Sequence, residues 1–201
     1  RSDLDVPDIQ LHFVNAVMIE HAKVQADRDG FTIHACQLRP ESRGRVFLKT
    51  PDGFDPPAID PNYLASETDR RVLRDSVRMT RAIVGQDALK LYRGPEMRRG
   101  PDINTDSEID AWIRRVAETI YHPVGTVRMG VDERAPVDPQ LRVRGVEGLR
   151  VIDASVMPTL IGGNTNAPTI MIAEKLSDLM RGKAPLAPEE APIAEDETAA
   201  A

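Results

Sequence analysis

A stretch that suits neither a helix nor a central strand divides the chain into two differently patterned parts. Residues 51–61 contain four prolines and a glycine, and proline lacks the N–H that helices and inner strands require. Before this stretch, apolar and polar residues alternate at 9–13, and further strand-like runs follow at 31–36 and 45–50. After it, apolar residues recur every three or four positions. We therefore expect a mixed α/β (α+β) fold with strands first and helices later.

Two helices are predicted after the proline-rich stretch. The first begins near Ser66, where Ser66–Asp69 resembles a capping box. The second begins at Thr105, whose hydroxyl can accept from a helix amide while Glu108 accepts from the N–H of the cap. Trp112 lies in an apolar stripe of helical spacing that continues to Ile120, so we expect a core residue rather than a ligand platform.

The last third of the chain predicts short strands and one more helix. The runs 141–143 and 149–153 are strand-like, and the second ends in Asp153. A polar loop then leads into an apolar run that continues to Arg181 and is closed by Gly182. Because this helix is apolar almost all round at its start, we expect its N-terminal end to be buried.

The charge balance excludes some partners. A net charge of −6 over 201 residues gives no basic surface for nucleic acid. Five of the acids follow residue 184 among prolines and alanines, so we expect residues 183–201 to form a disordered acidic tail. No apolar run is long enough to span a membrane. No signal region opens the chain, so a cytoplasmic location is expected.

Histidine and cysteine offer few metal ligands but one candidate base. The four histidines and the single cysteine lack zinc-like spacing, so no metal site is expected. His122 differs from the others because it enters a turn rich in glycine and proline, where its ring can face a cavity. A histidine there can take a proton near neutral pH.

A strand that ends in an acid, followed by a loop and a buried helix start, suits an anionic cofactor. The first amides of a helix have no internal partner and carry partial positive charge. The dinucleotide fingerprint G-x-G-x-x-G is absent from the 201 residues, so the chain is not a complete Rossmann enzyme.

Three ordered segments resemble the C-terminal hallmark of the glucose–methanol–choline (GMC) oxidoreductases, with the nearest likeness to the choline-dehydrogenase-like branch. They are YHPVGTVRMG at 121–130, VDPQLRVRGVEGLRVIDASVMP at 137–158 and GNTNAPTIMIAEK at 163–175. Two further segments, GRVFLK at 44–49 and FDPPAIDPNYL at 54–64, resemble the substrate domain of that family.

The resemblance implies an FAD-dependent oxidation of an alcohol to an aldehyde or ketone. Its H-P-x-G-T histidine corresponds to His122, which would take the alcohol proton while a hydride moves to the flavin N5. The family's second catalytic position, a His or Asn, corresponds to Asn164. Asn166 competes for that role but more plausibly touches the flavin or caps the helix, and Asn164 as a simple turn residue stays open.

The resemblance also implies where the cofactor and substrate lie. Asp153 and Ala154 correspond to the contact with the ribityl-pyrophosphate part of FAD. The helix start is expected to face the flavin ring, where its amides would stabilise negative charge. The residues concerned are Asn166, Ala167, Pro168 and Thr169. Ile120, two positions before His122, would shape the substrate pocket if the chain there is extended.

In such an enzyme the chain would be the C-terminal part. Residues 1–119 would end the antiparallel-sheet substrate domain, and 120–182 would supply the closing strand and helix of the FAD domain. The N-terminal FAD-binding half would lie elsewhere, in the same or a separate chain, and the small alcohol would be the other partner. Two alternatives stay open: a hydroxynitrile-type lyase on the same scaffold, and a non-catalytic fragment that binds a partner.

Overall fold

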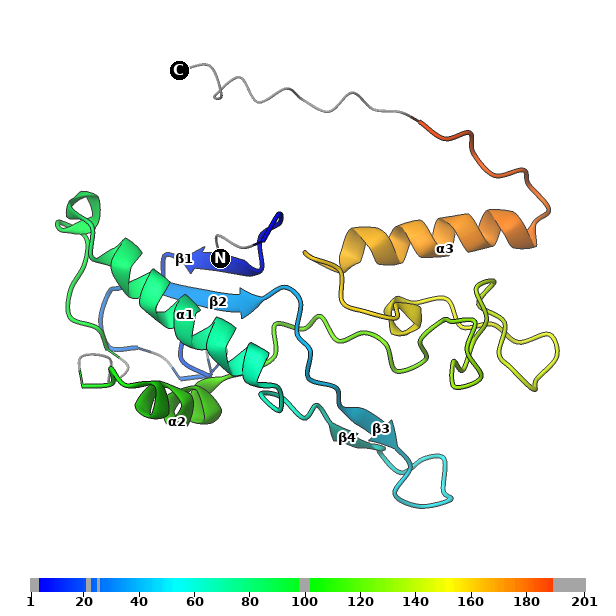
Figure 1. The fold of residues 1–201 in the computed structure, drawn as a ribbon, viewed down its shortest axis with the longest axis horizontal. Helices are drawn as coiled ribbons and strands as arrows, with labels where there is room; N and C mark the ends of the chain where they lie inside the picture. The colour runs from blue at the N-terminus through cyan, green and yellow to red at the C-terminus, as the bar shows by residue number, and fades with distance from the viewer. Residues whose placement is uncertain (1–3, 21–22, 25, 98–101, 190–201) are drawn as a thin grey trace.

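The computed structural model describes residues 4–20, 23–24, 26–97 and 102–189, and it combines helices with short strands, as predicted (Figure 1). The strands are β1 (Ile9–Val14), β2 (Thr32–Gln37), β3 (Arg45–Phe47) and β4 (Ala58–Asp60). The α-helices are α1 (Glu67–Val84), α2 (Asp106–Val116) and α3 (Asn166–Met180), and the 3-10 helices are η1 (Asp87–Leu89) and η2 (Ala154–Val156).

The strands form two separate antiparallel pairs. β1 pairs with β2 in a register that sets Gln10 opposite Cys36 and His12 opposite His34, which confirms the first two predicted strands. β3 pairs with β4 and is shorter than the predicted run 45–50. A Cβ on Gly44 would lie 2.1 Å from the carbonyl oxygen of Asp60, so the approach of these two segments requires glycine.

Helices α1 and α2 begin where the sequence predicts. The Ser66 hydroxyl accepts from the amide of Thr68 at 3.1 Å, and Thr105 and Glu108 form a complete capping box. The predicted continuation of α2 to Ile120 is wrong. The helix stops at Val116 because Ala117 adopts extended backbone angles, φ −67° and ψ 131°.

The two helices share a hydrophobic core. Leu64, Ile109 and Ile113 are buried there, and Trp112 packs against them, as expected of a core residue. A charged junction joins the helices beside this core, because the Arg74 guanidinium of α1 donates to both carboxylate oxygens of Asp110 in α2.

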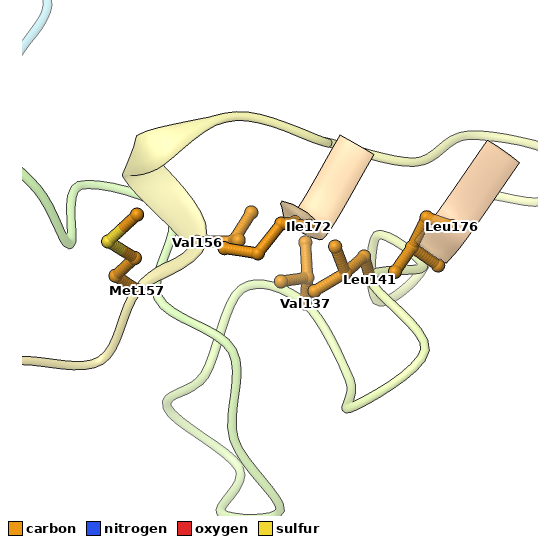
Figure 2. Packing of buried hydrophobic residues seen from close by; sticks show 6 residues of the cluster. All are labelled: Val137, Leu141, Val156, Met157, Ile172 and Leu176. Atoms are coloured by element: carbon orange, nitrogen blue, oxygen red, sulfur yellow. The ribbon is translucent and has the colours of Figure 1, made fainter. Parts of the chain in front are cut away.

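A second core lies beneath α3. Ile172 and Leu176 of the helix meet Val137, Leu141, Val156 and Met157, which come from the irregular segment before it (Figure 2). The predicted strands 141–143 and 149–153 are reduced to isolated bridges, which pair Arg142 with Arg150 and Val143 with Val137. They are joined by a turn in which Gly145 and Gly148 have positive φ, and the paired stretch is too short for regular strands.

Helix α3 confirms the predicted helix, but its start is not buried as expected. The Ile170 side chain is 54% exposed and that of Met171 is 57% exposed. The residues of α3 that are buried in the core are Ile172 and Leu176, and Pro168, Thr169 and Ala173 are half-buried.

The two hydrophobic cores share no member, and the division near residue 120 stays a prediction. In Figure 1, α1 lies across the β1–β2 pair, while α3 lies at the other end of the molecule over the irregular segment. Of the predicted tail, residues 183–189 are exposed and lack regular structure, and 190–201 lie outside the described residues. Among the described helices, none is long and apolar enough to cross a membrane.

Candidate active site

The candidate base His122 follows a strained residue. Tyr121 has φ 65°, a left-handed conformation that is an outlier for a bulky aromatic side chain. Strain of this kind is kept where the surrounding structure holds it, and it clusters at functional sites. His122 itself is half-buried.

The segment after His122 is fixed to the segment after Asp153. The amide of Val127 donates to the Ser155 carbonyl at 3.1 Å, and the amide of Met129 donates to the Val156 carbonyl at 2.8 Å. Gly125 has φ 87°, and a Cβ there would lie 3.3 Å from the Met157 carbonyl oxygen. The candidate base and the candidate cofactor contact at 153–154 are therefore held on one framework.

Asp153 caps η2 and keeps part of its carboxylate free for other contacts. Its Oδ1 accepts from the amide of Ser155 at 2.8 Å and also from the Ser155 hydroxyl. Among the described residues no hydrogen bond to Oδ2 is recorded. Ala154 packs against the core beneath α3.

The start of α3 presents unpartnered donors. Its N-cap, Thr165, makes no side-chain hydrogen bond to the helix, and the first turn carries no acidic residue. Pro168 has no N–H, and the Thr169 amide is taken by the Thr165 carbonyl at 3.1 Å. The amides of Asn166 and Ala167 therefore remain as the donors of this helix end.

Asn164 contacts a residue that the sequence did not single out. The Gln10 side-chain Nε2 donates to the Asn164 Oδ1 at 3.4 Å, across 154 positions of the chain. Strand alternation predicts that Gln10 and His12 share one face of β1, but nothing in the pattern shows which loop that face meets.

The two residues proposed for catalysis, His122 and Asn164, lie on separate segments of the chain. Over the described residues, no hydrogen bond joins His122 to Asn164. The extended geometry assumed between Ile120 and His122 is wrong, because Tyr121 lies between them in the left-handed region. The geometric reason for placing Ile120 in the substrate pocket is therefore lost.

Metal ligands and the single cysteine are alternatives to His122 as candidate site groups. No group of three or more histidine, cysteine or acidic side chains there could hold a metal ion. Burial raises the pKa of the Cys36 thiol, whose Sγ lies 3.6 Å from His12 Nε2, so it is protonated at neutral pH.

A shallow hollow lies away from these residues. It has a volume of about 360 Å³ and is formed by the turn at 142–150 with Asp138. None of the candidate site residues lines it, so we do not assign it to the reaction.

Comparison with known proteins decides the family. The family model for GMC oxidoreductases matches residues 40–173. The chain belongs to the GMC oxidoreductase family. The resemblance seen in the sequence motifs is thus confirmed, and with it a class of FAD-dependent oxidoreductases that includes choline dehydrogenases.

Individual relatives agree in sequence and in fold. The oxygen-dependent choline dehydrogenase of Chromohalobacter salexigens is 45% identical over 92% of this chain and 33% of its own length. The pyridoxine 4-oxidase of Mesorbium loti superposes with a TM-score of 0.81 at 32% identity, over 89% of this chain and 35% of that one. A formate oxidase of Aspergillus oryzae RIB40, studied for its FAD modification, superposes with a TM-score of 0.80 at 27% identity, over 90% of this chain and 32% of that one.

The GMC chain spans about a third of the length of these relatives. This agrees with the prediction of an N-terminal FAD-binding half outside these residues. It also gives a reason for the exposed start of α3, because a side chain such as Met171 has no covering neighbour here.

Proposed function

We propose that this chain is the C-terminal part of an enzyme that oxidises a small alcohol to an aldehyde or ketone, with His122 as the general base. The observation that carries the proposal is the H-P-V-G-T turn at 122–126, which follows the left-handed Tyr121 and leads into Val127 and Met129, whose amides donate to the carbonyls of residues 155 and 156. A backbone held in this way supports a fixed histidine ring, and proton abstraction needs such positioning.

The proposed reaction divides between two side chains. A neutral His122 takes the hydroxyl proton of the alcohol, which leaves negative charge growing on the substrate oxygen. The Asn164 amide donates to that oxygen, and it does so without adding a second ionisable group. FAD, when bound, supplies the acceptor for the hydride that leaves the alcohol carbon.

The donors and acceptors of the chain fit FAD. The free amides of Asn166 and Ala167, with no acid in the first turn of α3, suit the electron-rich edge of a flavin ring. Pro168 and Thr169 would complete that turn, and the Asp153 carboxylate with Ala154 would meet the ribityl-pyrophosphate part. We infer from this that residues 120–182 close the FAD domain and that residues 1–119 belong to the substrate domain.

An anaerobic titration tests the proposed function. The full-length enzyme loaded with FAD should lose its yellow colour when choline or another small alcohol is added without oxygen, because the substrate electrons remain on the cofactor. A hydroxynitrile lyase would release aldehyde from a cyanohydrin and keep the flavin oxidised. Unchanged flavin absorbance across a panel of alcohols, with cyanohydrin cleavage, would favour that alternative and contradict the oxidoreductase.

A further inference from the structure

The loop that carries Asn164 lies against the β1–β2 pair rather than standing alone. The Arg39 guanidinium, just after β2, donates to the Pro7 carbonyl at 2.6 Å. It also lies so close to Gly162 that a Cβ on that glycine would be 2.5 Å from its Nη2. The amide of Gly163 donates to the Ile161 carbonyl at 2.8 Å, which closes a tight turn. The loop is thus held two residues before Asn164.

The face of the strand pair that meets this loop is the polar one. Gln10 and Cys36 are opposite each other in the register, and the Cys36 Sγ lies 3.6 Å from His12 Nε2, so these three side chains share a face. The opposite face meets α1, because Gln37 donates to the Asp69 carboxylate of that helix at 2.9 Å. Gln10 therefore points away from α1 and toward Asn164.

We propose that Gln10 is a positioning residue that fixes the orientation of the Asn164 carboxamide. This inference rests on the proposed function, in which Asn164 donates to the substrate oxygen. The asparagine carboxamide has its acceptor oxygen on one side and an NH2 group, which carries both donors, on the other. Because Gln10 Nε2 donates to Oδ1, the acceptor faces the strand pair and the NH2 group remains for the substrate.

The orientation matters because the two ends of the amide have opposite effects. An NH2 group directed at the substrate oxygen stabilises the negative charge that grows on it, whereas a carbonyl oxygen in the same place repels that charge. Without Gln10, the Asn164 amide can rotate half a turn by itself, whereas beside Gln10 it keeps the hydrogen bond only if both amides rotate together. Gln10 thus acts on the reaction through Asn164 and has no need to touch the substrate.

Two substitutions of nearly equal size separate this role from a structural one. Gln10→Met keeps the length of the side chain and removes the donor. Gln10→Glu keeps length and polarity, but its carboxylate only accepts, so it would pair with the Asn164 NH2 group and turn the carbonyl toward the substrate. The proposal predicts that glutamate is the more harmful replacement, while a packing role predicts the reverse.

The experiment measures single-turnover flavin reduction in the full-length, FAD-loaded enzyme at saturating alcohol. We expect the limiting rate constant to fall about 3- to 10-fold for Gln10→Met and at least about 30-fold for Gln10→Glu. In an Asn164→Ala background, Gln10→Met should have almost no further effect, because the residue through which it acts is gone. A crystal structure of Gln10→Glu should show the Asn164 amide in the reversed orientation.

Gln37→Ala is the matched control. It removes a glutamine from the same strand pair on the face away from Asn164, so the melting temperature should fall while the limiting rate constant stays near wild type. The proposal is overturned if Gln10→Glu is as active as Gln10→Met, or if Gln10→Met lowers the rate equally with and without Asn164. If Asn164→Ala itself has no effect on flavin reduction, the proposed function of Asn164 fails instead, which is a distinguishable result.

Discussion

At the residue level, His122 and Asn164 have different proposed roles and lie on different loops. His122 follows the left-handed Tyr121, and Asn164 lies on a loop held by Arg39 and Gln10. Each is kept in place by its neighbours rather than by the other. We therefore expect substitutions at the two positions to slow the same step, flavin reduction, through the loss of a base at His122 and of a donor at Asn164.

Replacing Asn164 tests its role as a donor. In the full-length enzyme, Asn164→Ala should weaken transition-state stabilisation by roughly 2–4 kcal/mol, as the loss of an oxyanion donor does. That corresponds to a fall of about 30- to 1000-fold in the rate constant for flavin reduction. Asn166→Ala is the comparison, since it leaves the backbone amide at the helix start. A larger loss for Asn166→Ala would move the catalytic role to that residue.

At the scale of elements, a charged junction holds α1 to α2. The Arg74 side chain is 9% exposed, and it contacts Glu67 at 2.7 Å, Asp110 at 2.8 Å and Asp106 at 3.5 Å. These contacts raise the pKa of the guanidinium, chiefly through the hydrogen bond to Glu67. The hydrogen bond from Arg74 is also the main cause that lowers the pKa of Glu67.

Arg74→Met should lower the free energy of unfolding by roughly 1.5–3 kcal/mol, the usual range for hydrogen bonds to charged groups. The released carboxylates regain water, so the loss should stay below that of a fully buried ion pair. Denaturant unfolding of the full-length enzyme measures this. Arg114→Met, on an exposed part of α2, is the control. Equal stability of the two variants would contradict a structural role for the junction.

The same junction predicts that the stability of the fold depends on pH. The folded state lowers the pKa of Glu67 and of Asp106, the latter mainly through the hydrogen bond from Arg78. Their contribution to the free energy of unfolding is therefore complete when the pH is above about 4.5, the ordinary pKa of glutamate. It is lost as the pH falls toward the lower pKa values of the folded state. The melting temperature should fall below pH 4.5, with a shallower slope in Arg74→Met. A steeper slope in the variant would show that other groups control acid unfolding.

The N-terminal cap of α2 should make a smaller contribution to the free energy of unfolding. Thr105 accepts from the Glu108 amide, and the Glu108 carboxylate accepts from the Thr105 amide at 2.9 Å. Thr105→Ala should cost about 1 kcal/mol of the free energy of unfolding, while Thr105→Ser, which keeps the hydroxyl, should stay near wild type. Chemical denaturation of the three proteins decides this. Identical losses for alanine and serine would mean that the threonine methyl, not the cap, is responsible.

Helix starts and strands could be predicted from the sequence because their signals lie in neighbouring residues. The capping box at Thr105 and the alternation in β1 need only neighbouring residues. The end of α2 at Val116, the exposed start of α3 and the Gln10–Asn164 contact depend on distant segments. His122 and Asn164 were found through motifs of the family, since periodicity alone does not distinguish a catalytic turn from any other.

At the scale of the whole molecule, the chain exposes apolar surface that an isolated domain normally buries. Ile170 and Met171 at the start of α3 are more than half exposed, and Phe54 is 97% exposed. Surface of this kind typically meets another part of a protein. We expect these side chains to contact the part of the enzyme that lies outside these residues, since the chain spans about a third of the length of its relatives.

The isolated chain should therefore not retain FAD. Purified residues 1–201 should be colourless and should bind a dye for exposed apolar surface, because the part of the enzyme that would hold the adenosine end is not in these residues. Restoring the N-terminal part, as one chain or as two, should give a yellow protein with less dye binding. A yellow isolated chain with stoichiometric flavin would contradict this division.

The central claim is that His122 takes the proton of the alcohol, and its most direct test is single-turnover flavin reduction by an alcohol in His122→Gln of the full-length enzyme. Arg115→Gln, an exposed change seven positions earlier, is the control. We expect bound FAD in both variants, with a rate constant about 10²- to 10⁴-fold lower only for His122→Gln. A rate constant for His122→Gln equal to that of the wild type would contradict it.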